Sequence, residues 1–238
     1  MSIPGFDSWL GSAQGRYVMD WEQDKLDEAV ADIFGFNALQ FGVPQYDLLR
    51  ANRIPMRQKA GEFGAVDVLC SMTALPFASH STDLIVLPHV LEFSADPHQI
   101  LREVERILIP EGQVVIVGFN PLSLWGLKRQ LDRSGDFPWN GRYLSLTRLA
   151  DWLQLLGFEV DRGTLGCYAP PFVQQKWLHR WHFIESAGER WWNFSGGVYL
   201  LRAIKRVHGI RLITPDWRKK AVRAKALRTV THKEGHGH

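Results

Sequence analysis

The chain has 238 residues, of which 45% are hydrophobic and 22% are charged, as in an ordinary globular protein that buries a core. No apolar run approaches the roughly 20 residues needed to span a bilayer, so the sequence predicts no membrane span. Cys70 and Cys167 have no pairing or metal-ligand spacing, and the first residues do not resemble a secretory signal. We therefore expect a cytoplasmic protein.

The net charge of +3 hides an uneven distribution along the chain. Residues 1–201 carry 17 Lys and Arg against 23 Asp and Glu, whereas residues 202–238 carry 11 against 2. Such a basic tail is typical of a solvated, flexible segment, and contact with RNA or another anion is the functional alternative. We expect three parts: an N-terminal helical segment at 1–36, an α/β domain at 37–210 and a basic tail at 211–238.

Residues 16–34 have apolar positions at helical spacing, which predicts an amphipathic helix that ends at Gly35. We expect its acidic side chains to face water: Asp20, Glu22, Asp24, Asp27, Glu28 and Asp32. The pattern that follows is less regular. It predicts a strand at 38–42, a short helix at 44–52, and extended segments at 55–60 and 66–71.

The middle of the chain carries the clearest pattern. Residues 82–87 and 113–118 are continuous apolar runs of strand length, and an Asp-Pro pair at 96–97 predicts the start of a helix that runs to residue 108. Two buried strands joined by a helix make a parallel, right-handed βαβ unit. The sequence therefore predicts an α/β fold with a doubly wound, mostly parallel sheet, which binds ligands beyond the carboxyl ends of its strands.

The second half continues this alternation. After Asn120 and Pro121, which read as a helix cap, we expect helices at 121–131 and 147–156 and strands at 158–161 and 198–204. Between the last two lies a tryptophan-rich stretch, residues 177–192, whose spacing is typical of a helix packed into a core. A lid over a ligand or a face for a partner is the functional alternative.

The run "ALPFASHSTDLIVLPHVLEFSADPHQILREVERILIPEGQVVIVGFNP", residues 74–121, resembles the central stretch of S-adenosylmethionine-dependent class I methyltransferases of the type 11 group. The stretch "GGVYLLRAIKR" resembles the last strand of that group. The resemblance implies a Rossmann-like enzyme that uses S-adenosylmethionine to methylate an acceptor, which the sequence does not identify. The alternative is a non-catalytic, methyltransferase-like binding or scaffold module.

The resemblance also implies which positions meet the cofactor, at the ends of three strands. These positions are Gln40, Phe41 and Gly42 after the first strand, Ser71 and Met72 beside the adenine, and Leu87, Pro88 and His89 after the fourth strand. The chain departs from the family at several of them. Only Gly42 matches the usual glycine motif, Gln40 replaces an acid, and Ser71 replaces an aspartate, so we expect weaker binding than is usual for the family.

A further departure lies between the second and third strands of the family. Residues 60–66 are too few for the usual helix, because a parallel crossover takes roughly 10–12 residues or more. We therefore expect no helix there, and either one strand is missing or 56–60 and 66–71 pair as a hairpin. The acid that holds the ribose hydroxyls in the family is not predicted, and Glu62 is the nearest carboxylate.

His89 is the candidate catalytic residue, because an imidazole near its usual pKa can accept a substrate proton. A histidine hydrogen-bonded within its own loop is the structural alternative. No metal site is predicted, since the histidines of the tail are loosely spaced, at His232, His236 and His238.

Overall fold

The computed structural model describes residues 5–132, 134–171 and 195–207, all within one compact unit. Its helices are α1 (Phe6–Leu10), α2 (Ala13–Val30), η1 (Leu91–Phe93), α3 (Pro97–Ile107), α4 (Leu124–Leu131) and α5 (Leu146–Leu155). Its strands are β1 (Asn37–Phe41), β2 (Met56–Gly61), β3 (Val68–Leu69), β4 (Thr82–Pro88), β5 (Leu108–Phe119), β6 (Phe158–Gly166) and β7 (Val198–Lys205). The tryptophan-rich stretch and the basic tail lie outside the described residues. Within the described ranges, no helix is both long and apolar enough to cross a membrane.

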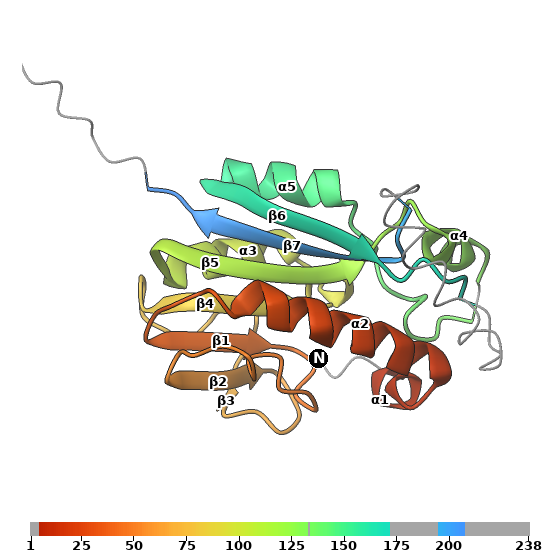
Figure 1. Cartoon of the computed structure of the whole chain (residues 1–238), viewed down its shortest axis with the longest axis horizontal. Coiled ribbons are helices and arrows are strands. Elements are labelled where there is room, and N and C mark those ends of the chain that lie inside the picture. Colours follow the sequence, from red (N-terminus) through yellow and green to blue (C-terminus); the bar gives the residue numbers. More distant parts are fainter. Residues whose placement is uncertain (1–4, 133, 172–194, 208–238) are drawn as a thin grey trace, which may run out of the picture. The chain divides into compact units, whose positions relative to one another are not determined.

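The strands form one seven-stranded sheet in the order β3-β2-β1-β4-β5-β7-β6 (Figure 1). The first five strands pair in parallel, whereas β7 runs antiparallel to both β5 and β6. The order runs outward in one direction from β1 and in the other from β4. The doubly wound, mostly parallel sheet predicted from the sequence is confirmed, and its switch point lies between β1 and β4, where ligands bind in such sheets.

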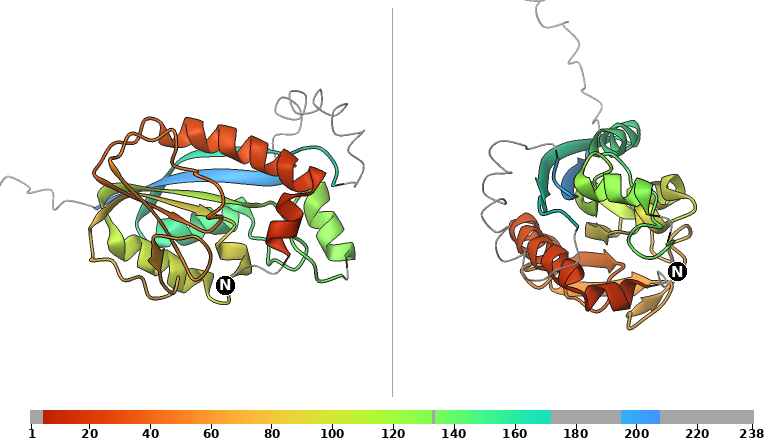
Figure 2. Two further views of the ribbon diagram at one scale, coloured as in Figure 1. Left: turned by 90° about the horizontal axis from the view of Figure 1, so that it is seen from below. Right: turned by 90° about the vertical axis from the view of Figure 1, so that its right-hand side faces the viewer.

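Helices cover both faces of the sheet, and the two cores alternate along each central strand. In β4, Leu84 and Val86 pack with the residues of α1 and α2, whereas Ile85 and Leu87 pack with those of α3 and α5. Figure 2 shows α2 on one side of the sheet and α3 and α5 on the other. Both faces of the parallel strands are therefore buried, which explains why these strands read as continuous apolar runs.

Helix α2 differs from the prediction at its end and on one face. It ends at Val30, so Gly35 is not its cap. A Cβ at Gly35 would lie 2.3 Å from Cγ of Asp83, so glycine there permits the close approach of that side chain. The prediction that the acidic residues of the helix all face water is wrong for Glu22, which is fully buried. Spacing explains its burial, because Glu22 lies one turn after Val18 on the apolar face.

The connection from β2 to β3 contains no helix, as predicted, but neither predicted alternative for the strands is correct. No strand is missing and no hairpin forms, because β2 and β3 pair in parallel. The two residues of β3 lie beside Ala60 and Gly61 at the end of β2, so the chain has only a short distance to return. A long crossover is needed only when the second strand starts far back along the first.

Two other local predictions are wrong. Residues 44–52 form turns rather than a helix. Helix α4 begins at Leu124 with Ser123 as its N-cap, not at Asn120 and Pro121. The side chain of Asn120 instead donates a hydrogen bond of 2.9 Å to the carbonyl of Gly196, which joins the end of β5 to the start of β7. The cap at Asp96 is confirmed, since its carboxylate accepts a hydrogen bond from the backbone N–H of Gln99 at the start of α3.

Candidate functional site

A cavity of about 300 Å³ lies at the carboxyl ends of β1, β2 and β4. Its walls are the segments that follow these strands, together with the approach to α3 and Phe6 of α1. The volume is at the lower end of the range of about 300–1,000 Å³ that is usual for ligand pockets. The cavity is therefore the candidate ligand site, at the edge of the sheet where the strand order reverses.

Half of the positions that the resemblance assigns to cofactor binding are found in the lining of this cavity. Gly42, Met72, Pro88 and His89 are among its lining residues. The other four positions do not line it. Phe41 and Leu87 are buried in the core, and Gln40 is buried in the turn after β1. Ser71 is exposed, and its hydroxyl lies 3.1 Å from that of Thr73.

Gly42 allows two segments of the cavity wall to approach each other closely. Its φ of +76° lies in the left-handed region, which favours glycine. A Cβ at Gly42 would lie 3.0 Å from both the carbonyl oxygen of Pro88 and Cγ2 of Val90. Val43 follows with a φ of +44°, which strains a β-branched residue. A side chain at Gly42 would therefore disturb the wall where β1 and β4 end.

Gln40 holds this strained turn from inside. Its Nε2 donates hydrogen bonds to the carbonyls of Val43 at 3.1 Å and Tyr46 at 3.0 Å, and it also reaches the carbonyl of Gly42 at 3.3 Å. Its Oε1 accepts a hydrogen bond of 3.0 Å from the backbone N–H of Leu48. An amide can both donate and accept, whereas a carboxylate can only accept. The glutamine is thus suited to a structural task, and its side chain is not available to a ligand.

Glu62, to which the sequence alone assigns no role, lies at the cavity. It follows β2 directly and lines the cavity, half-buried, although no helix separates β2 from β3. Its Oε1 accepts a hydrogen bond of 3.4 Å from the backbone N–H of Met72, another lining residue. The signal in the sequence is its place immediately after a strand, and the assumption of a hairpin obscured it.

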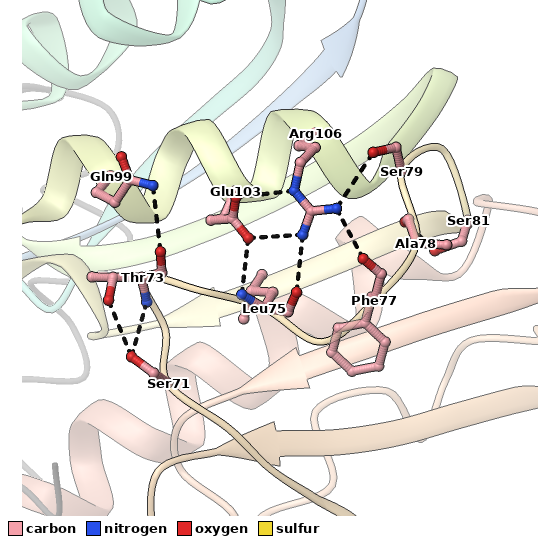
Figure 3. A network of polar contacts seen from close by, with 10 residues as sticks. All are labelled: Ser71, Thr73, Leu75, Phe77, Ala78, Ser79, Ser81, Gln99, Glu103 and Arg106. Atoms are coloured by element: carbon pink, nitrogen blue, oxygen red, sulfur yellow. Dashed lines mark hydrogen bonds and ion pairs between the residues drawn. The ribbon is translucent and has the colours of Figure 1, made fainter.

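A network around Arg106 of α3 holds the segment that leads from Met72 to β4 (Figure 3). The guanidinium donates hydrogen bonds of 2.9 Å to the carbonyls of Leu75 and Phe77 and pairs with Glu103. Glu103 in turn accepts a hydrogen bond of 2.8 Å from the backbone N–H of Leu75. Arg106 and Glu103 therefore have a structural role. They hold the segment that follows Met72, a residue of the cavity wall.

His89 follows Pro88 at the end of β4, and its side chain is buried between two carboxylates. Its Nε2 lies 2.6 Å from Oε1 of Glu22 in α2, and its Nδ1 lies 3.2 Å from Oε2 of Glu92 in η1. Burial disfavours the charged imidazole, but the two carboxylates outweigh it and raise the pKa of His89 to about 10. The ring is therefore a cation near neutral pH.

This geometry argues against the catalytic task predicted for His89. Both ring nitrogens are engaged, the side chain is 0% exposed, and an imidazolium has no lone pair with which to accept a proton. The structure instead favours the alternative, a histidine bonded within its surroundings. The sequence does not reveal the partner Glu22, because it lies on a helix that is distant in the chain.

The sequence matches a family model and a curated protein. Residues 45–116, from just after the Gly42 turn to within β5, match the family model described as "Methyltransferase domain". Over 157 residues the chain is 34% identical to the uncharacterized protein YafS of Escherichia coli, a match that covers 65% of each protein. The chain thus spans slightly less than two thirds of the length of this relative.

Solved structures of methyltransferases share the fold. A protein of Thermotoga maritima, described as a possible histamine N-methyltransferase, aligns with 84% of this chain and 94% of its own at 15% identity and a TM-score of 0.61. A chain from the complex of the Trm112 methyltransferase activator with a methyltransferase of Haloferax volcanii aligns with 86% of this chain and 97% of its own, at 18% identity and a TM-score of 0.57. At such identities the likeness concerns the fold.

The sheet order and the cavity at its switch point define a Rossmann-like fold, which solved methyltransferases share. Residues 45–116 match the methyltransferase family model, and the fold is that of the class I, S-adenosylmethionine-dependent methyltransferases. The resemblance found in the sequence is confirmed.

Proposed function

We propose that the chain binds S-adenosylmethionine in the cavity at the ends of β1, β2 and β4 and catalyses transfer of its methyl group to an acceptor. The observation that carries the proposal is the placement of the Gly42 turn, Glu62 and Met72 around one cavity in a fold of this class. Three separate strands deliver these residues, and the cavity is large enough for a small ligand.

The residues present suit the cofactor. The Gly42 turn offers backbone without a side chain, which suits the amino-acid end of the ligand beside Pro88. Glu62 offers a carboxylate that accepts hydrogen bonds from the ribose hydroxyls, and Met72 offers an apolar surface to the adenine. We assign the ribose contact to Glu62 because it is the carboxylate that immediately follows β2.

The chemistry asks little of the protein. Bound S-adenosylmethionine supplies a methyl group on a sulfonium, which is already activated toward nucleophiles. The tasks left to the chain are to hold the acceptor in line with that methyl group and to exclude water. The apolar lining, which includes Phe6, Val90 and Phe93, suits the second task. His89 takes no part in proton transfer in this proposal, because its ring is buried and charged.

The proposal also covers the compartment in which the reaction takes place and the kind of acceptor or partner. Among the described residues, neither Cys70 nor Cys167 forms a disulfide, which suits a reaction in the cytoplasm. The basic residues 211–238 suit an anionic acceptor or partner such as RNA, and this part of the proposal rests on charge.

Calorimetry of the purified chain with S-adenosylmethionine and S-adenosylhomocysteine tests the proposal. We expect binding heat with both ligands at concentrations up to about 1 mM, which corresponds to a binding free energy of about −4 kcal/mol. S-adenosylmethionine carrying a labelled methyl group, cross-linked by ultraviolet light, should label peptides from the Gly42 and Met72 segments. If neither ligand produces heat at that concentration, the non-catalytic scaffold is the better interpretation.

A further inference from the structure

Three ionisable side chains meet in the core beside the cavity. Glu22 comes from α2, His89 from the end of β4 and Glu92 from η1, and their side chains are 0%, 0% and 1% exposed. Removing charges from water is costly, and an ion pair offsets that cost only when the geometry is good. A core that needed only to be stable would be served better by apolar residues, so this cluster calls for a separate explanation.

The cluster holds His89 in an unfavourable backbone conformation. The φ of His89 is +53°, in the left-handed region. The ring is stacked on Phe119 with 4.4 Å between centroids, and the backbone N–H donates a hydrogen bond of 2.9 Å to the carbonyl of Val117. Glu92 also accepts a hydrogen bond from the backbone N–H of Phe119. The side chain of His89 is therefore restrained by α2, by η1 and by β5.

The neighbours of His89 in sequence form the wall of the cavity. Pro88 and Val90 both line it, and they are the residues against which Gly42 packs. Because His89 is joined covalently to both residues, a change in its backbone conformation would displace both contacts at once. The distance between the Gly42 turn and the opposite wall thus depends on how the buried side chain of His89 is held.

The ring of His89 lies between two carboxyl groups, and one of their oxygens has no hydrogen-bond partner among the described residues. That oxygen is Oε2 of Glu22. Tyr143 and Tyr199 also face Glu92. Burial first, and then that carboxylate, raise the pKa of both phenols, so neither adds a charge. The position of the Glu22 side chain therefore depends on its hydrogen bond to His89.

We propose that Glu22 and Glu92 are positioning residues, which hold His89 between them and thereby fix the Pro88–Val90 wall against Gly42 at the spacing that the cofactor needs. The inference rests on the proposed binding of S-adenosylmethionine in the cavity. It predicts that a change of charge in the core alters ligand affinity although no ligand atom touches the substituted side chain.

The main test uses Glu22→Gln, which keeps the shape and a hydrogen-bonding group but removes one negative charge. Without that charge the pKa of His89 falls, so the ring loses its proton within the range from about pH 6 to about pH 9. The matched control is Glu28→Gln on the same helix, where the carboxylate is exposed and pairs with Lys25. If Glu22→Gln does not fold, Glu92→Gln removes the other carboxylate and tests the same point.

The first measurement needs no ligand. Nitrogen-15 spectra follow the imidazole of His89 and the backbone amides of Gly42 and Val90 across that pH range. In the wild type and in the control we expect no titration of the ring. In Glu22→Gln we expect the ring to titrate and the two amide signals to move with the same midpoint. A titrating ring with stationary amides would overturn the proposal, since the wall would then be independent of the ring.

The second measurement is calorimetry with S-adenosylmethionine at the two ends of the range. We expect wild-type affinity to change little with pH, and Glu22→Gln to bind about tenfold more weakly at the higher pH than at the lower. An affinity of Glu22→Gln that is equal to that of the wild type at both pH values would overturn the proposal. If the wild type binds no ligand, the proposed function fails, and the amide signals still decide whether the cluster positions the wall.

Discussion

Oε1 of Glu22 in α2 lies 2.6 Å from Nε2 of His89 at the end of β4, although 67 positions separate the two residues. The contact joins the N-terminal helix to the edge of the sheet where the cavity lies. The N-terminal segment is thus part of the architecture of the candidate site, both through Glu22 and through Phe6 of α1, which lines the cavity. Four predictions follow from the geometry of this region.

The charge on His89 should make stability depend on pH. The pKa of this group is raised from its ordinary value of 6.5 to about 10 in the folded protein, so its stabilising contribution is fully present below about pH 6.5 and is lost as pH rises through about 10. We expect the free energy of unfolding in urea to fall between about pH 7 and about pH 10. In Glu22→Gln the corresponding loss should occur at lower pH, and identical curves for the two proteins would contradict this.

Glu62→Gln should weaken binding of S-adenosylmethionine by about 10-fold to 100-fold, because a charge-assisted hydrogen bond contributes about 1.5–3 kcal/mol. Its melting temperature should change little, since the side chain is only half-buried. The control is Asp151→Asn, an exposed carboxylate on α5. If calorimetry gives the two variants equal affinities for S-adenosylmethionine, Glu62 does not contact the cofactor.

Gly42→Ala and Gly135→Ala form a matched pair. Both glycines have positive φ, +76° and +73°, so alanine is strained at both, at a cost of about 1–2 kcal/mol. A Cβ at Gly42 would meet Pro88 and Val90 at 3.0 Å, whereas a Cβ at Gly135 has no neighbour within 4 Å. We expect both variants to lose stability in urea titrations, Gly42→Ala more because of its contacts, but loss of cofactor binding in Gly42→Ala only. Binding lost in both variants would point to instability instead.

Gln40→Glu restores the acid that is usual in the family, and we expect it to damage this protein. A carboxylate cannot donate to the carbonyls of Val43 and Tyr46, so it would face two acceptors within a buried turn. We expect a loss of about 3 kcal/mol or more in the free energy of unfolding. The control is Gln130→Glu, which is exposed on α4. A stable Gln40→Glu variant with improved binding would show that the turn can rearrange around a ligand.

The sequence was informative where structure depends on near neighbours. The apolar runs of β4 and β5 and the cap at Asp96 rely on interactions within a few residues, and they define the βαβ unit without tertiary information. The resemblance extended this unit to the whole sheet. The resemblance was less informative about the site. Residues of the matched run such as Arg106 and Leu75 hold a loop in place rather than bind a ligand.

The tertiary structure alone decided the parallel pairing of β3, the place of Glu62 in the cavity and the partners of His89. The helical spacing already put Glu22 on the apolar face of α2, one turn after Val18, but its charge suggested solvent. A buried carboxylate is stable only opposite a partner, and that partner, His89, follows a strand that is distant in the chain. Periodicity in a sequence predicts which face of a helix is buried. The residue that pairs with a charged side chain on that face is determined by how the helix packs on the sheet.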